Sequence, residues 1–153
     1  MSTFALEPIG VVRSSRTEAT DDDWDAETSR IELLPPFDER SLRGLETFSH
    51  CLVVFVFDRA TWSEERILRR PRGNPDWPEV GIFAQRAKDR PNRLGVSVAR
   101  IVAVEGATLH LAGLDAIDGT PVVDVKPWMD GFGPRGPVHE PTWATDLMRN
   151  YWA

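Results

Sequence analysis

The sequence predicts an all-β fold, a closed β-barrel with short peripheral helices. Apolar and β-branched residues recur in short runs of strand length, and turn-forming residues separate these runs. Helical spacing is confined to short segments, and strands do not alternate with helices as they do in parallel sheets. A chain of 153 residues has the length of one domain that can bury its own core.

The strand candidates show a period-two pattern or an unbroken apolar run between turns. They span residues 8–14, 30–34, 50–57, 95–104, 107–111 and 122–125. The run 50–57 is almost entirely apolar, which predicts a strand covered on both faces at the centre of the barrel. In the longest candidate we place the four valines at 96, 98, 102 and 104 on one side. Glu105-Gly106 then predicts a tight hairpin to the next strand.

Helical patterns are short and lie outside these strands. Asp38 can cap a brief helix whose Leu42, Leu45 and Phe48 recur every third residue and pack against the sheet. Ile67 and Leu68 suggest another brief helix, which the prolines and Gly73 stop early.

A last helix is predicted from residue 142 to 152, because Trp143, Leu147 and Tyr151 lie at i, i+4 and i+8. A linker rich in glycine and proline precedes this helix. We therefore divide the chain into a barrel domain, residues 1–137, and a C-terminal helix, residues 138–153, that packs on the barrel or on a partner subunit.

Charge is distributed unevenly along the chain. The net charge is −6, yet residues 59–100 hold ten basic and five acidic side chains. Arginine, which suits bidentate contact with phosphate or carboxylate, supplies sixteen of the eighteen basic residues. An anionic substrate can approach this middle third at an exposed crest formed by Arg69, Arg70 and Arg72, or the crest is merely solvated surface. The acidic residues gather instead in segment 17–27, which we expect to be a mobile loop.

Several functional classes find no support in the sequence. No G-x-G-x-x-G motif follows a strand, so a Rossmann cofactor site is excluded. The three histidines have no ligand spacing, and we expect no metal. The single cysteine, Cys51, lies in an apolar run and predicts a buried thiol rather than a nucleophile. No apolar run reaches the ~18 residues of a membrane span and no signal-peptide pattern is present, so we expect a cytoplasmic protein.

Three motifs mark the middle of the chain: F-A-Q-R at residues 83–86, R-P-N-R-L-G at 90–95 and G-L-D-A-I-D-G-T-P-V-V-D-V-K-P-W at 113–128. With segments 9–14 and 43–50, they resemble the TsaA-like or TrmO-like family of S-adenosylmethionine-dependent tRNA methyltransferases. The resemblance covers most of the chain up to residue 128. It implies a small barrel, usually a homodimer, that methylates the exocyclic nitrogen of threonylcarbamoyl-adenosine beside the tRNA anticodon.

The resemblance also implies which residues bind S-adenosylmethionine. The turn at 118–121 can present backbone groups to the cofactor at close range, because Gly119 has no side chain and Pro121 stiffens its exit. The same turn is also explained as an ordinary hairpin turn. Arg86 can clamp the methionine carboxylate, or it forms a structural salt bridge. The cofactor-binding residues we expect are Phe83, Ala84, Arg86, Asp58, Arg59, Asp118, Gly119, Thr120 and Pro121.

Two departures from the family pattern affect this prediction. Relatives commonly carry a loop with Pro and Gln or Gly after the first strand, where this chain has the acidic segment. Many relatives also have a His where the central strand ends, and here Asp58 and Arg59 take its place. The chain also lacks the additional C-terminal domain of longer bacterial members, which predicts a compact form.

Methyl transfer depends mainly on alignment, because the donor carries its own leaving group. A carboxylate that polarises the acceptor N–H would assist a poor nucleophile. We name Asp118, Asp124 and Lys126 as catalytic candidates, with Asp115 as a further carboxylate. For the substrate we name Arg69, Arg70, Arg72, Arg90 and Asn92, although Asn92 can instead simply cap a turn. Three functions stay open: tRNA methylation, methylation of a small molecule, and cofactor binding without catalysis.

Overall fold

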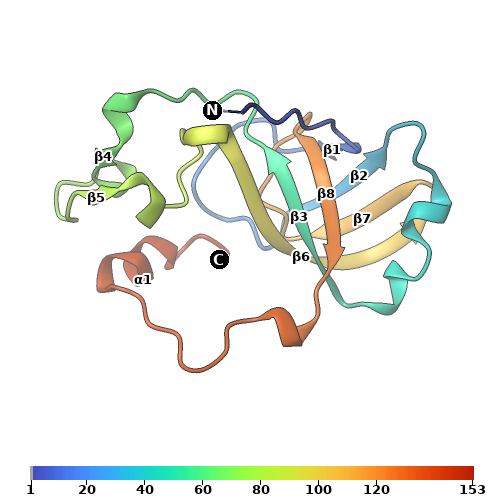
Figure 1. Ribbon diagram of the computed structural model, residues 1–153. Coiled ribbons are helices and arrows are strands. Elements are labelled where there is room, and N and C mark those ends of the chain that lie inside the picture. The colour runs from blue at the N-terminus through green and yellow to red at the C-terminus, as the bar shows by residue number, and fades with distance from the viewer. Residues whose placement is uncertain (1) are drawn as a thin grey trace.

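Six antiparallel strands close into a barrel in the order β1-β2-β7-β6-β3-β8, and β8 pairs again with β1 (Figure 1). The structure, a computed structural model, describes residues 2–153. The barrel strands are β1 (Gly10–Ser14), β2 (Thr28–Leu33), β3 (His50–Val56), β6 (Leu94–Glu105), β7 (Thr108–Ala112) and β8 (Pro121–Pro127). A separate two-stranded ribbon consists of β4 (Leu68–Arg69) and β5 (Val80–Gly81). The predicted all-β barrel is therefore confirmed.

The core fills the barrel interior and follows strand alternation. Along β3, Cys51, Val53 and Phe55 are buried, and the residues between them are only half-buried. This corrects the prediction that the strand is covered on both faces, because one barrel wall has only one inner face. Burial raises the pKa of the Cys51 thiol to about 12, in keeping with a structural rather than a nucleophilic cysteine. The other fully buried core residues come from β1, β2, β7, β8 and the segment before β8.

Strand β6 has small residues inside and valines outside. Gly95, Ser97 and Ala99 are buried, whereas Val96 and Val98 are 40% and 39% exposed. The space inside is taken by the rings of Phe55 and Phe57, which lie edge to face with centroids 5.3 Å apart. A bulge between Ile101 and Ala103 then shifts the register. Val102 therefore faces outward and Val104 packs on the core, so the prediction that all four valines share one side is wrong.

The predicted helix after Asp38 is two short 3-10 helices, η1 (Glu39–Leu42) and η2 (Leu45–Thr47). Asp38 caps the first, since its carboxylate accepts the Arg40 backbone N–H at 3.0 Å. Gly44 separates the two, with a φ of 93° that ordinary residues rarely adopt. Leu42 is buried and Leu45 packs on the core, so this part of the predicted apolar stripe is confirmed, whereas Phe48 follows η2 in an extended conformation. The remaining 3-10 helices are η3 (Glu64–Arg66), η4 (Pro71–Gly73), η5 (Ile82–Ala84), η6 (Pro91–Arg93) and η7 (Asp130–Phe132).

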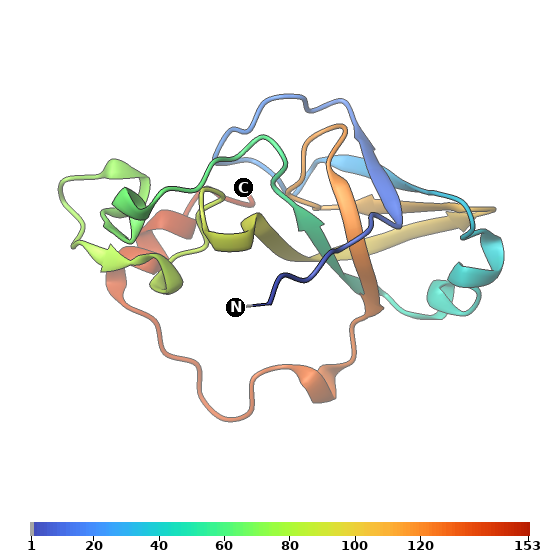
Figure 2. The same ribbon diagram turned by 45° about the horizontal axis from the view of Figure 1, so that its top comes forward.

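The C-terminal helix is shorter than predicted. Helix α1 spans Thr142–Met148 and lies beside the β4–β5 ribbon in both views (Figures 1 and 2), with the Trp143 and Trp77 ring centroids 6.5 Å apart. The chain then leaves the helix and returns toward the barrel. Tyr151 therefore does not share a helical face with Trp143, and the division of the chain at residue 137 stays a prediction. In the ribbon, Leu68 belongs to β4 instead of the predicted helix.

Within residues 2–153, no helix combines the length and the apolar character needed to cross a membrane. The same residues include no cluster of three or more His, Cys, Asp or Glu side chains placed to hold a metal ion.

Asp89 joins the two ends of the segment that carries the ribbon. Its carboxylate accepts the Thr61 backbone N–H at 3.1 Å and forms ion pairs with Arg66 and Lys88. Burial raises the pKa of Asp89, but these hydrogen bonds and positive charges outweigh it and hold the pKa below its ordinary value. Because the folded pKa is depressed, the stabilisation is present above the unfolded value near ~3.9 and is lost as the pH falls through the folded pKa.

We therefore expect Asp89→Asn to lower the free energy of unfolding by about 1 kcal/mol at pH 7, and the difference from wild type to shrink at pH 3. Urea unfolding of both proteins at the two pH values measures this. Asp146→Asn, which removes an exposed ion pair with Arg149, is the control and should change little. An equal loss for Asp89→Asn at both pH values would contradict the assignment.

Candidate functional site

The turn before β8 is clamped onto the first strand. The Asp118 carboxylate accepts the Ser14 backbone N–H at 3.0 Å, and the Gly119 N–H donates to the Val12 carbonyl at 2.8 Å. Thr120 is buried, with its hydroxyl donating to the Ile117 carbonyl at 2.7 Å. Gly119 has a φ of 84°, and a Cβ there would meet nothing within 4 Å. The turn is therefore rigid, and its backbone is open to a ligand at the glycine.

The 118–121 turn lies at one end of the barrel, which we call the rim. Hydrogen bonds connect it to other segments in which we expected cofactor-binding or substrate-binding residues. Asp118 N–H donates to the carbonyl of Arg16, and the next carbonyl, of Thr17, accepts from Arg59 at 3.2 Å. Arg93 in turn donates to the carbonyl of Asp58 at 3.3 Å, which joins the 90–93 turn to the end of β3. The structure thus brings the 118–121 turn, residues 58–59 and the 90–93 turn to one end of the barrel.

Within the 90–93 turn, Arg90 and Asn92 differ in what their side chains can do. Arg90 donates to the Gln85 carbonyl at 2.7 Å and is half-buried, so it holds the backbone of the neighbouring segment. Asn92 is exposed and has a φ of 62°, a conformation that Asn tolerates better than most residues. Asn92 can therefore meet a ligand, whereas Arg90 is already engaged by the protein.

The 3-10 helix η5 follows directly on β5, which stops at Gly81, and leads into Gln85 and Arg86. Ile82 is buried and Gln85 holds the carbonyls of Arg69 and Val80 at 3.0 Å each. These contacts fix the turn and leave Phe83 80% exposed. Ala84 is also exposed. Arg86 is exposed and donates one N–H to the Val96 carbonyl at 2.6 Å. This contact with a carbonyl takes the place of the structural salt bridge that the sequence left open.

Asp124 and Lys126 do not join Asp118 at the rim. They pair with each other at 2.9 Å, and their neighbours across β3 are the half-buried Val54 and Leu52. Paired residues of antiparallel strands point to the same side, so both lie on the outer face of the barrel. Of the three predicted catalytic residues, only Asp118 lies in the rim turn.

Two of the three crest arginines are occupied. Arg72 pairs with Asp21 at 3.8 Å and with Asp22 at 3.1 Å, and Arg70 donates to the Trp77 carbonyl. Arg69 lies in β4 and is half-buried. The acidic segment 17–27 therefore neutralises part of the basic middle third.

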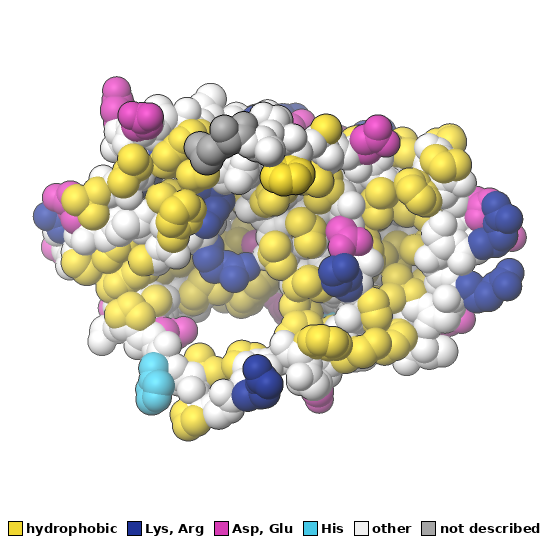
Figure 3. Space-filling view, in the orientation of Figure 1, with side chains coloured by type: hydrophobic (Ala, Val, Ile, Leu, Met, Phe, Trp, Pro, Cys, Tyr) yellow, Lys and Arg dark blue, Asp and Glu magenta, His cyan; other side chains and the backbone are white. Residues whose placement is uncertain are grey.

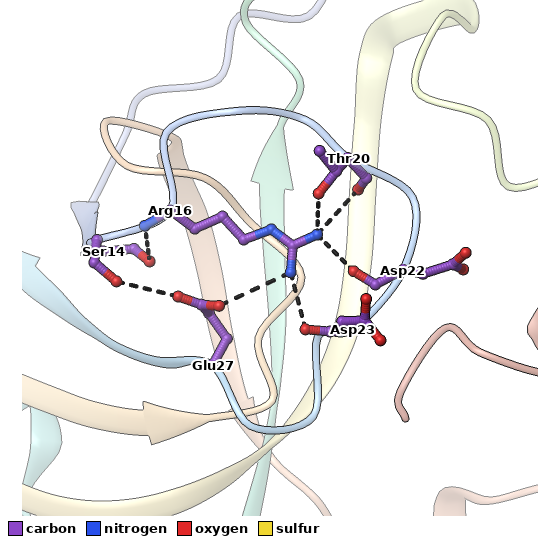
Figure 4. A network of polar contacts seen from close by, with 7 residues as sticks. Ser14, Arg16, Thr20, Asp22, Asp23 and Glu27 are labelled. Carbon is purple, nitrogen blue, oxygen red and sulfur yellow. Dashed lines mark hydrogen bonds and ion pairs between the residues drawn. The ribbon is translucent and has the colours of Figure 1, made fainter.

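The acidic segment is not the free loop that its composition suggests. The Arg16 guanidinium lies inside it and donates to the carbonyls of Asp23 at 2.9 Å and Asp22 at 2.6 Å, to both oxygens of Thr20, and pairs with Glu27 (Figure 4). The same guanidinium stacks over the buried Trp24 ring, 3.5 Å from its centroid. At its far end, Asp25 pairs with Arg100 of β6 at 2.6 Å. These contacts give the segment one defined shape.

The C-terminal tail, residues 150–152, packs against the acidic segment and near the 115–121 turn, and we call this region the corner. The sequence pattern did not reveal this position of the tail. Backbone N–H groups of Asp23, Trp24 and Asp25 donate to successive carbonyls of residues 150–152. The Tyr151 hydroxyl donates to Asp115 Oδ2, while Asp115 Oδ1 is buried and has no hydrogen-bond partner in the part of the chain that the structure describes. Arg86 and Arg72 are close enough for their charges to act on the Tyr151 pKa. The tail therefore lies between the Arg86 segment and the 115–121 turn.

Two cavities open elsewhere on the barrel, and only the second reaches the 115–121 turn. One, of about 480 Å³, is apolar and sits at the other end of the barrel against η1 and η2. The second, of about 520 Å³, is a more open groove across the ends of β1, β2 and β7 and the bulge of β6, and Asp118 is in its wall. Neither is lined by Arg86 or Thr120.

The donor implied by the family resemblance carries an ammonium group and a carboxylate at its methionine end, and an adenosine at the other. The corner offers a guanidinium, Arg86, for the carboxylate. For a cationic or N–H donor it offers Asp115 Oδ1, a buried oxygen that accepts no hydrogen bond from the described part of the chain. The donor groups of the corner therefore fit S-adenosylmethionine. Gly119, where a side chain is absent, leaves room for the adenosine beside the turn.

Hydrophobic side chains cover much of the surface over β3, β6 and β8 (Figure 3). They include the outward-facing Val96 and Val98 of β6, which pair with Val54 and Leu52 of β3. The linker 133–141 stands away from this face and leaves an opening between itself and the barrel (Figures 1 and 3). This apolar outer face is suited to contact with another protein surface.

Comparison with known proteins gives consistent matches. A family model described as the tRNA-methyltransferase O N-terminal domain matches residues 19–133. A Pseudomonas aeruginosa protein named as a putative S-adenosylmethionine-dependent methyltransferase is 39% identical over 83% of this chain and 58% of its own length. The Escherichia coli tRNA (adenine(37)-N6)-methyltransferase is 34% identical over 84% of this chain and 59% of its own length. The chain thus spans a little over half the length of these curated relatives.

Among solved structures, the crystal structure of TrmO from Pseudomonas aeruginosa superposes with a TM-score of 0.74 at 35% sequence identity. The superposition covers 90% of this chain and 61% of that chain. Fold and sequence therefore point to the same set of relatives.

Proposed function

This chain belongs to the tRNA-methyltransferase O family, and from that membership we propose that it transfers a methyl group from S-adenosylmethionine to the N6 position of an adenosine in tRNA. The observation that carries the proposal is that Tyr151 links two charges: its hydroxyl donates to Asp115, whose buried Oδ1 has no hydrogen-bond partner among residues 2–153, and the charge of Arg86 acts on the same hydroxyl. Such a corner matches the charges of the donor without any nucleotide-binding helix.

In this proposal each group has a separate task. S-adenosylmethionine, when bound, supplies the methyl group and its own leaving group. Arg86 holds the donor carboxylate, and the backbone around Gly119 and Pro121 lies against the adenosine. Asp118 fixes the turn through Ser14 and, as the one predicted catalytic residue at the rim, is the carboxylate we assign to the acceptor N–H. Most of the rate gain then comes from orientation of the two reactants.

We further propose threonylcarbamoyl-adenosine beside the anticodon as the acceptor. The exposed Phe83 and Asn92 near the rim are suited to an extruded base, through stacking and hydrogen bonding respectively. The acidic segment 17–27 supports a second candidate, a small-molecule acceptor, because it neutralises Arg72 and Arg100, which would otherwise meet phosphate. Donor binding without transfer is the third candidate.

Mass spectrometry of nucleosides separates the three candidates. The protein is incubated with S-adenosylmethionine carrying an isotopically labelled methyl group and with tRNA that contains or lacks threonylcarbamoyl-adenosine. Label on the threonylcarbamoyl nucleoside alone supports the proposed acceptor, and label on unmodified adenosine as well supports the broader tRNA activity. Donor binding in calorimetry without label in tRNA favours one of the other two candidates, and no donor binding overturns the proposal.

The basic crest gives a prediction about RNA binding. The Arg69, Arg70 and Arg72 triple substitution to Gln should reduce the slope of log K against log salt by about 0.7 to 0.9 for each arginine that contacts phosphate. We expect the total reduction in slope to be closer to the value for two phosphate contacts than to the value for three, because Arg72 is already paired with the acidic segment. Filter binding over a series of salt concentrations measures the slope, with Arg40→Gln on η1 as control. An unchanged slope would mean that the crest is only solvated surface.

We propose a homodimer that pairs the apolar outer face over β3, β6 and β8. Replacing Val96 and Val98 together by Lys should convert the dimer to a monomer in light scattering, since the lysines would place like charges opposite each other across a two-fold axis. The matched exposed pair Ile67 and Leu68, changed to Lys on the ribbon, should leave the dimer intact. A wild-type monomer would contradict the proposal. The expected cytoplasmic location likewise stays a prediction.

A further inference from the structure

Tyr151 is the one tyrosine in the sequence, and its hydroxyl makes a contact that links two distant parts of the chain. It donates to Asp115 Oδ2, thirty-six residues earlier, at the base of the 115–121 turn. Asp115 itself leaves its second oxygen, Oδ1, buried and without a hydrogen-bond partner among residues 2–153. A carboxylate oxygen in that situation is costly for a fold to keep, which points to a ligand donor.

Backbone hydrogen bonds of the tail fix the position of Tyr151. Residues 150–152 are held by three backbone hydrogen bonds from the acidic segment, between 2.9 and 3.2 Å long. The acidic segment is in turn shaped by the Arg16 guanidinium (Figure 4). Tyr151 is therefore placed by two ordered segments, and its ring packs edge to face on Trp152 with centroids 4.9 Å apart.

The charge balance at the contact keeps Tyr151 a donor. Burial, followed by the negative charge of Asp115 and the hydrogen bond to it, raises the pKa of the Tyr151 hydroxyl well above its usual range, and the charges of Arg86 and Arg72 oppose this only in part. The hydroxyl therefore stays protonated at neutral pH. Asp115 then has one oxygen occupied by an uncharged donor, and its negative charge remains available to a cation.

We propose that Tyr151 is a positioning residue of the donor site, which orients Asp115 so that Oδ1 receives the ammonium group of S-adenosylmethionine. The proposal rests on the proposed function and extends it to a tail residue outside the segment that the family model matches. Arg86, whose charge also acts on Tyr151, would take the donor carboxylate, so the corner would bind both charged groups of an amino acid.

The test compares two ligands that differ in the amino-acid end and in the charge on sulfur. Calorimetry on the full chain measures the affinity of S-adenosylmethionine and of 5′-methylthioadenosine, which has the adenosine but neither the ammonium nor the carboxylate. Tyr151→Phe keeps the ring and should weaken S-adenosylmethionine binding about tenfold, the value of one hydrogen bond to a charged group, and leave 5′-methylthioadenosine unchanged. Asp115→Asn should weaken it at least as much, and the double variant no more than Asp115→Asn, since Tyr151 acts through Asp115.

A spectroscopic readout checks the contact without any ligand. Because the chain has one tyrosine, the tyrosinate absorbance reports Tyr151 alone. Its titration should begin well above the ordinary value of about 10 in the wild type and move down in Asp115→Asn. A Tyr151 that titrates normally in the wild type would overturn the contact and the inference with it.

The outcomes distinguish a failure of the inference about Tyr151 from a failure of the proposed function. If wild type binds S-adenosylmethionine and Tyr151→Phe binds it equally well, the inference fails and the proposed function stands. If Tyr151→Phe weakens both ligands to the same extent, the residue only supports the fold and the inference fails. If wild type does not bind S-adenosylmethionine, both fail together.

Discussion

Gly95→Ala is expected to destabilise the barrel by about 3 kcal/mol, which lowers the melting temperature by about 6 to 12 °C. A Cβ at this position would stand 2.5 Å from Phe55 Cε2, 2.7 Å from Phe55 Cζ and 2.8 Å from Phe57 Cζ. All three are ring atoms, and the two rings pack against each other, so neither ring can move aside at low cost. Gly95 has no positive φ, so the cost comes from overpacking and not from backbone strain.

Thermal unfolding followed by circular dichroism measures this effect. Gly131→Ala is the matched control, because a Cβ there would meet nothing within 4 Å and its φ is not positive. We expect the control to lie within about 0.5 kcal/mol of wild type. A similar small change in Gly95→Ala would contradict the packing of β6 against Phe55. The clash that a Cβ at Gly95 would make also gives a structural reason why the R-P-N-R-L-G motif ends in glycine.

Arg86→Gln is expected to weaken S-adenosylmethionine binding by about 10- to 100-fold, the range for losing a charged hydrogen-bonding partner. Gln retains a donor for the Val96 carbonyl, which Arg86 contacts at 2.6 Å, and so removes mainly the positive charge and the fork geometry. Arg86→Lys keeps the charge without the fork, and we expect an intermediate affinity. Binding of 5′-methylthioadenosine should change little in both variants.

Calorimetry with each variant supplies these affinities. Arg40→Gln is the control, since Arg40 lies on η1 and pairs with Asp38 alone among the described residues. Unchanged binding in Arg86→Gln would show that Arg86 serves the backbone of β6 and that the donor carboxylate is held elsewhere.

The barrel was predictable because the strands appear in the sequence as short apolar or alternating runs between turns. Alternation around Val53 and Val125 also contained the signal that places Asp124 and Lys126 outside, and applying it would have removed both from the catalytic set. The valines of β6 do not mark its inner face, for two reasons. They occupy the outer face, where an apolar row is unusual, and the bulge after Ile101 changes which side Val104 faces.

The corner was predictable only in part. The motifs identified the 83–86, 90–95 and 113–128 segments, and hydrogen bonds join the last two through Arg16, Thr17 and Asp58. The tail was missed because Trp143, Leu147 and Tyr151 share a helical spacing, whereas backbone pairing with residues 23–25 takes the chain out of the helix after Met148. The acidic segment is ordered around a single side chain, Arg16, which binds its carbonyl groups. Such an arrangement leaves no periodic pattern in the sequence from which it could be predicted.

Hydrogen–deuterium exchange with and without S-adenosylmethionine tests the placement of the donor most directly. We expect slower exchange in residues 81–90 and 113–121 and in the tail, because Tyr151 of the tail donates to Asp115 and is reached by the charge of Arg86. Slower exchange confined to residues 37–48 would place the ligand in the apolar cavity at the opposite end of the barrel and contradict this donor site.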